Sequence, residues 1–84
     1  MPKTLRTPAH MALMTSLIDC RKVRGVTQQQ LADLLNRPQS FIAKVETGER
    51  RIDAVELVEW SMKLGADVAV LLAPVTAALR GQQQ

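Results

Sequence analysis

The chain has 84 residues and a formal net charge of +3, which is enough for one small domain with a modest core. Hydrophobic residues make up 46% of the chain and aromatic residues only 2%, so an aliphatic helical core is favoured over a β-sandwich. No apolar run reaches the roughly 18 residues of a membrane span, and a single cysteine excludes an internal disulfide bond, so we expect a cytoplasmic protein.

The positive charge is concentrated in the first part of the chain. Residues 1–51 contain nine lysines and arginines and four acidic residues, whereas residues 52–84 contain two and four. This asymmetry points to an anionic partner for the first part. Alone it is a weak indication, because most charged segments are simply solvated surface.

The N-terminal part predicts an arm followed by a helix. Residues 1–7 lack periodicity, and apolar residues at helical spacing then run from Pro8 to about Arg24. Proline suits the first position of a helix. We interpret Cys20 as a small core residue on the apolar face. We interpret His10 as a surface or capping residue, because the chain has no second histidine to join it in a ligand cluster.

The segment 27–46 predicts two short helices joined by a tight turn, the arrangement of a helix-turn-helix. Its apolar residues form two stripes of helical spacing on either side of an interruption. Asn36 suits the left-handed conformation that such a turn requires. Pro38 stops the first helix and can begin the second. We therefore expect helices over residues 27–35 and 38–46.

Further helical segments follow. Asp53 has the spacing of a capping box at the start of a helix, and Trp60 lies on the inner face of that helix, so we interpret it as a core or interface residue. A short apolar helix over residues 68–73 should end at Pro74, which leaves at most one or two further turns. Residues 81–84 should be disordered.

Residues 67–80 form an apolar segment with almost no charge. Two interpretations remain open: these side chains could cover the core of one protomer, or they could form a homodimer interface. We favour the interface, because exposed apolar patches usually mark association. The residues expected in it are Val68, Leu71, Leu72, Val75 and Leu79.

A set of residues between Leu17 and Asp67 has a joint spacing far more specific than any single motif. It comprises Arg21, Gly25-Val26-Thr27-Gln28, Leu31-Ala32, Ile42, Lys44-Val45-Glu46 and Gly48-Glu49-Arg50. Through these residues the chain resembles the lambda-repressor-like, Cro-type helix-turn-helix domains of the xenobiotic-response-element (XRE) family of bacterial and phage regulators. Asn36 and Pro38 depart from the usual turn glycine and the usual serine or threonine. The resemblance implies an all-α, five-helix DNA-binding domain over residues 8–66.

The resemblance also implies which residues contact DNA. In similar domains the exposed face of the third helix touches base edges in the major groove. Glutamine can form two hydrogen bonds with adenine, lysine can reach the acceptors of guanine, and alanine can meet a thymine methyl group. The implied base-reading residues are Gln39, Ser40, Ala43 and Lys44, and the implied phosphate contacts are Gln28, Arg37, Arg50 and Arg51.

Arg21 and Glu46 are charged residues with apolar neighbours in the sequence. Charged side chains at such otherwise core-facing positions are tolerated only when they are paired. Similar domains join these two places by an ion pair. We therefore expect a bidentate pair that fixes the first helix against the end of the third.

These observations predict a homodimeric transcriptional regulator, by expectation a repressor, that reads a pseudo-palindromic operator with half-sites ~34 Å apart. An enzyme is disfavoured, because the sequence has no Ser/His/Asp set, glycine-rich phosphate loop or metal-ligand spacing. Glu56 and Glu59 are interpreted as capping and surface charge, and no cofactor is expected. An antitoxin that binds a protein toxin through a separate surface is the alternative that remains open.

Overall fold

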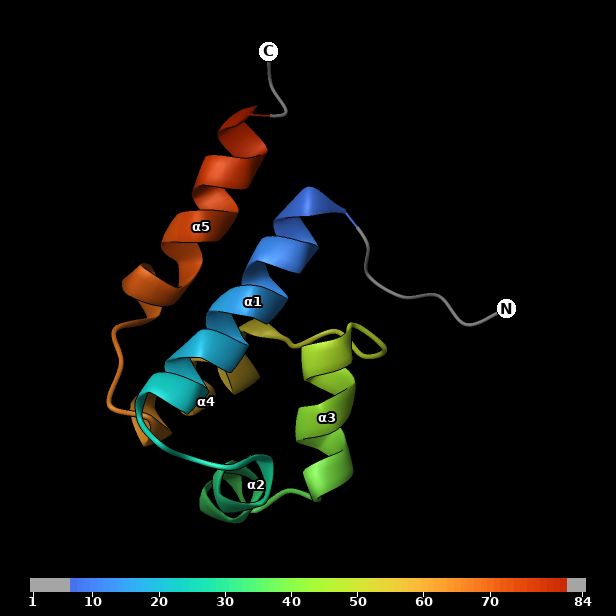
Figure 1. Cartoon of the computed structure of the whole chain (residues 1–84), viewed down its shortest axis with the longest axis vertical. Coiled ribbons are helices and arrows are strands. Elements are labelled where there is room, and N and C mark those ends of the chain that lie inside the picture. Colours follow the sequence, from blue (N-terminus) through green and yellow to red (C-terminus); the bar gives the residue numbers. More distant parts are fainter. Residues whose placement is uncertain (1–6, 82–84) are drawn as a thin grey trace.

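The structure, a computed structural model, describes residues 7–81, and these form five helices and no strand. The helices are α1 (Pro8–Val23), α2 (Gln28–Leu35), α3 (Gln39–Thr47), α4 (Ala54–Lys63) and α5 (Val68–Gly81). In Figure 1, α5 lies alongside α1, while α2 and α3 form the helical pair at the other end of the molecule. The all-α fold expected from the sequence is confirmed. The predicted N-terminal arm and C-terminal tail, apart from Thr7 and Gly81, lie outside the described residues.

The core is aliphatic, with one tryptophan at its centre. The largest fully buried side chains are Trp60, Leu17, Leu31 and Ile42, which come from four different helices. Trp60 is therefore a core residue, the first of the two possibilities that its spacing allows. Cys20 is also buried in this cluster. No helix among residues 7–81 combines the length and the apolar composition that crossing a membrane would require.

The ends of α2 and α3 follow the local chemistry of the sequence. The Thr27 hydroxyl accepts a hydrogen bond from the Gln30 backbone N–H at 3.0 Å, and the Gln30 side chain accepts one from the Thr27 N–H at 2.9 Å. Asn36 adopts a left-handed backbone with φ of 56°. Pro38 is the N-cap of α3, so this helix begins at Gln39, one residue later than the sequence predicts.

The C-terminal helix differs from the expectation. The sequence pattern predicts a helix that ends at Pro74, but α5 continues through this residue to Gly81. An internal proline removes one backbone hydrogen bond and costs roughly 3 kcal/mol. Packing of α5 along α1 offsets this cost, and the Ser16 hydroxyl donates a hydrogen bond to the Leu71 carbonyl at 2.8 Å. Gly81, which the sequence predicts to be disordered, is the last residue of α5.

The apolar residues of α5 divide between the core and the surface. Leu71 is only 2% exposed and belongs to the core, and Val68 and Leu72 pack against that core. The prediction that Leu71 contributes to a dimer interface is therefore wrong, because a side chain covered within the protomer leaves no surface for a partner. Val75 is half-buried and Leu79 is exposed, so these two residues retain surface on the helix.

Candidate nucleic-acid interface

The helix α3 presents a polar face to solvent. Gln39, Ser40 and Lys44 are exposed, and Ala43 is half-buried beside them. The opposite face carries the buried residues Phe41, Ile42, Val45 and Glu46. All four predicted base-reading residues therefore share one surface, and an α-helix has the width that the major groove of DNA accepts.

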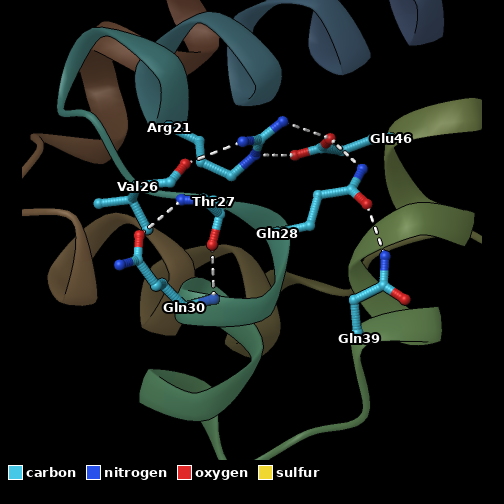
Figure 2. A network of polar contacts seen from close by, with 7 residues as sticks. All are labelled: Arg21, Val26, Thr27, Gln28, Gln30, Gln39 and Glu46. Carbon is cyan, nitrogen blue, oxygen red and sulfur yellow. Dashed lines mark hydrogen bonds and ion pairs between the residues drawn. The ribbon is translucent and has the colours of Figure 1, made fainter.

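A buried ion pair fastens one flank of α3 to α1. The Arg21 Nε lies 2.7 Å from Glu46 Oε2, and its Nη2 lies 3.0 Å from Glu46 Oε1, as Figure 2 shows. The two side chains are 9% and 4% exposed. Arg21 also donates a hydrogen bond from Nη1 to the Val26 carbonyl at 2.8 Å. The expected bidentate pair is present. Together with the bond to Val26, it connects α1 both to α3 and to the segment that precedes α2.

The same network continues to the exposed face of α3. Gln28 Nε2 donates to Glu46 Oε1 at 2.9 Å, and Gln39 Nε2 donates to Gln28 Oε1 at 2.7 Å (Figure 2). The carboxylate of Glu46 can only accept, so it fixes which end of the Gln28 amide faces it. Gln28 in turn fixes the amide of Gln39. The resemblance implies a phosphate contact for Gln28 but gives no indication of this link to Gln39.

The other flank of α3 carries a cluster that the sequence analysis missed. The guanidinium groups of Arg37 and Arg50 lie over the Phe41 ring, at 4.4 and 4.6 Å from its centroid. Both arginines also form ion pairs with Glu56. The spacing of Phe41 to Val45 would have placed this phenylalanine on the inner face of α3, but no local pattern connects Arg37 with Glu56.

Glu56 is the centre of this cluster. Its carboxylate accepts hydrogen bonds at 3.0 Å from Arg50 Nη1, Arg50 Nη2 and the Asp53 backbone N–H, and a further one from Arg37. The bonds from Arg50 are the main cause that lowers the pKa of Glu56 to about 2, against the opposing effect of burial. Glu56 is therefore ionised at neutral pH, and its interpretation as simple capping charge is incomplete.

The backbone carbonyl of Arg51 accepts a hydrogen bond from Arg50 Nη1 at 2.7 Å, but the Arg51 side chain points away from the cluster, towards His10. It is exposed, and its Nη1 lies 3.2 Å from His10 Nε2 near the start of α1. The other ring nitrogen of His10 lies 2.9 Å from the Thr7 hydroxyl. Of the three arginines predicted to bind phosphate, Arg51 is thus the one without a carboxylate partner among residues 7–81. Within the same residues, no group of three His, Cys, Asp or Glu side chains is arranged to hold a metal ion.

Comparison with known proteins places this geometry in a family. Residues 17–71 match the helix-turn-helix family HTH_3. An XRE-family like protein from Pseudomonas syringae pv. tomato is 39% identical, with a TM-score of 0.76 over 82% of this chain and 84% of that one. The chain belongs to the XRE-type helix-turn-helix family, and its fold is that of DNA-binding regulators.

More distant structures share the fold. The clp gene regulator ClgR from Corynebacterium glutamicum is 25% identical, with a TM-score of 0.76 over 84% of this chain and 92% of that one. The restriction-modification controller protein C.AhdI from Aeromonas hydrophila is 24% identical, with a TM-score of 0.69 over 74% and 94%. Among curated proteins, none matches the chain.

Proposed function

We propose that this protein is a sequence-specific, double-stranded DNA-binding repressor that acts as a homodimer on a pseudo-palindromic operator. The observation that supports this most directly is the hydrogen-bonded chain from Glu46 through Gln28 to Gln39. It orients an exposed glutamine on the solvent face of α3 before any ligand arrives. A side chain that is already oriented loses less conformational freedom on binding.

The orientation of Gln39 suits adenine. One N–H of its amide is used by Gln28, which leaves the carbonyl oxygen and the second N–H. These two groups match the N6 donor and the N7 acceptor that adenine presents in the major groove. Lys44, farther along the same face, has the reach and charge for the guanine acceptors, and Ser40 and Ala43 complete the reading surface.

Phosphate contacts would hold this surface in register. Arg51 is exposed and has no acidic partner among the described residues. Gln28 retains a second amide N–H at the start of α2, where the backbone N–H groups and the helix dipole favour an anion. Such contacts add affinity for every duplex, whereas Gln39 and Lys44 would distinguish one sequence from another.

The first prediction separates base reading from phosphate binding. Lys44→Ala should lose ~1–3 kcal/mol on the preferred operator and relax the preference at one position. Arg51→Ala should weaken binding to all duplexes equally and reduce the salt slope by about one counterion. Competition between matched and mismatched duplexes measures both effects. An equal loss on every duplex for Lys44→Ala would remove this residue from the base-reading set.

The homodimer would use the outward side of α5. The double substitution Val75→Glu and Leu79→Glu should convert the dimer into a monomer. It should also reduce operator affinity, because a monomer contacts only one half-site. Sedimentation velocity at micromolar concentration measures the change. Val55→Glu is the control, because Val55 is an equally apolar exposed residue on α4. A wild-type protein that is already monomeric, or a double variant that stays dimeric, would contradict this arrangement.

The antitoxin alternative adds a protein partner to the same DNA-binding fold. Purification of the tagged protein from its own cells separates the two functions. A stoichiometric protein partner that stays bound without DNA would support the antitoxin. Retention of specific duplex DNA alone would support the repressor.

A further inference from the structure

In the cluster on the second flank of α3, two arginines pair with the carboxylate of Glu56, and the carboxylate of Asp53 also acts on Arg50. Arg37 lies just before α3 and Arg50 just after it, and both stack on Phe41 and pair with the single carboxylate of Glu56. The arginine side chains are 39% and 40% exposed, whereas the Glu56 side chain is only 8% exposed. The carboxylate therefore lies beneath two cations that remain open to solvent beside the proposed DNA-binding face.

The helix cap at α4 does not explain why residue 56 is charged. Glu56 Oε1 accepts a hydrogen bond from the Asp53 N–H at 3.0 Å, which completes the capping box of α4. At α2 the same function is performed by an uncharged side chain, since Gln30 Oε1 accepts from the Thr27 N–H at 2.9 Å. An amide is thus sufficient for the cap. The negative charge at position 56 acts on the two arginines.

The donors around Glu56 also suit a phosphate group. Guanidinium groups bind carboxylates and phosphates with the same two-pronged geometry. Arg50 holds Glu56 in this way through Nη1 and Nη2, both at 3.0 Å, and Arg37 adds a further donor. A phosphate of the DNA backbone and the carboxylate of Glu56 therefore compete for the same N–H groups.

We infer that Arg37 and Arg50 form an anion site that Glu56 occupies in place of a DNA phosphate, so that Glu56 limits binding to duplexes of arbitrary sequence. This inference rests on the proposed DNA-binding function. An arginine that is neutralised within the protein has few counterions to exchange with DNA, so it adds little to the salt-dependent affinity shared by all sequences. Binding then depends more on the base contacts of α3, and Glu56 is a specificity-determining residue.

Substitution of Glu56 by glutamine tests this inference, because glutamine keeps the size of the side chain and the acceptor for the cap. Fluorescence anisotropy with a labelled duplex of random sequence, measured over a range of salt concentrations with the full chain, gives affinity and salt slope together. We expect Glu56→Gln to bind several-fold more tightly at low salt, with a slope steeper by about one to two counterions. Circular dichroism at the assay temperature verifies that the variant is folded.

Two further variants complete the design. Asp19→Asn removes the same charge from an exposed position of α1, outside this cluster, and should leave the slope near the wild-type value. Arg50→Gln in the wild-type background should reduce the slope by well under one counterion, because the carboxylates of Glu56 and Asp53 already oppose the charge of Arg50. A slope that falls by about one counterion in Arg50→Gln would overturn the inference, as would an unchanged slope or weaker binding in folded Glu56→Gln. A wild-type protein that binds no duplex at all would instead contradict the proposed function itself.

Discussion

Substitution of Arg21 by methionine should destabilise the protein by about 3–5 kcal/mol, because it leaves the buried carboxylate of Glu46 without its cation. The pair is bidentate, at 2.7 and 3.0 Å, and both side chains are almost fully covered. An exposed pair of the same kind would contribute only about 0–1 kcal/mol. Urea denaturation followed by circular dichroism gives the free energy of unfolding.

The coupling free energy between the two side chains is measured by a double-mutant cycle with Arg21→Met, Glu46→Gln and the double variant. The double variant should be less destabilised than the sum of the single ones, because it leaves neither charge unpaired. Lys22→Met is the matched control, since Lys22 is the exposed neighbour of Arg21 on α1, and it should change stability by less than about 0.5 kcal/mol. Additive single losses would show that the pair does not couple α1 to α3.

The second large effect is a loss of folding stability at acidic pH, when Glu56 becomes protonated. Arg50 and Arg37 lower the pKa of Glu56 from 4.5 to about 2, so the folded protein holds this carboxylate ionised more strongly than the unfolded chain does. The resulting stability is present above about pH 4.5 and is lost as the pH falls towards 2. At neutral pH it amounts to at most about 3 kcal/mol, and to about 2 kcal/mol after allowance for the exposure of the arginines.

Urea denaturation of the wild type and Glu56→Gln at pH 7 and at pH 2.5 measures this contribution. We expect the variant to be less stable at pH 7 and the difference to shrink strongly in acid, where Glu56 is largely protonated in the unfolded chain. Asp19→Asn, which removes a charge from an exposed position of α1, should change stability by less than about 0.5 kcal/mol at pH 7. A Glu56→Gln difference of the same size at both pH values would mean that the charge of Glu56 does not stabilise the fold.

Local chemistry made part of this structure predictable. Thr27 begins α2 through hydrogen bonds with Gln30, three residues away. Asn36 ends α2 because asparagine tolerates the left-handed backbone conformation. The partners Arg21 and Glu46 are 25 residues apart, and their pairing came from the resemblance rather than from spacing. The proposed base-reading residues of α3 likewise came from the resemblance, and the exposure of Gln39, Ser40 and Lys44 on one face agrees with helical periodicity.

Other features depend on packing between distant segments. Pro74 is unfavourable for a helix by local rules, and only the contact of α5 with α1 allows α5 to continue through it. The same contact buries Leu71, which a sequence pattern cannot distinguish from a surface leucine. Arg37 and Glu56 are 19 residues apart on different elements. No periodic pattern in the sequence links them, so only the structure reveals the arginine cluster.

Selection of bound sequences from a pool of random duplexes, with the wild type and Gln39→Ala in parallel, tests sequence-specific reading by α3 most directly. For the wild type we expect an enriched pseudo-palindrome with half-sites about 10 base pairs apart and an adenine in each half-site. In Gln39→Ala, the preference for that adenine should disappear while the rest of the motif remains. Recovery of no common motif from the wild type, or of the same adenine from both proteins, would contradict base reading by Gln39.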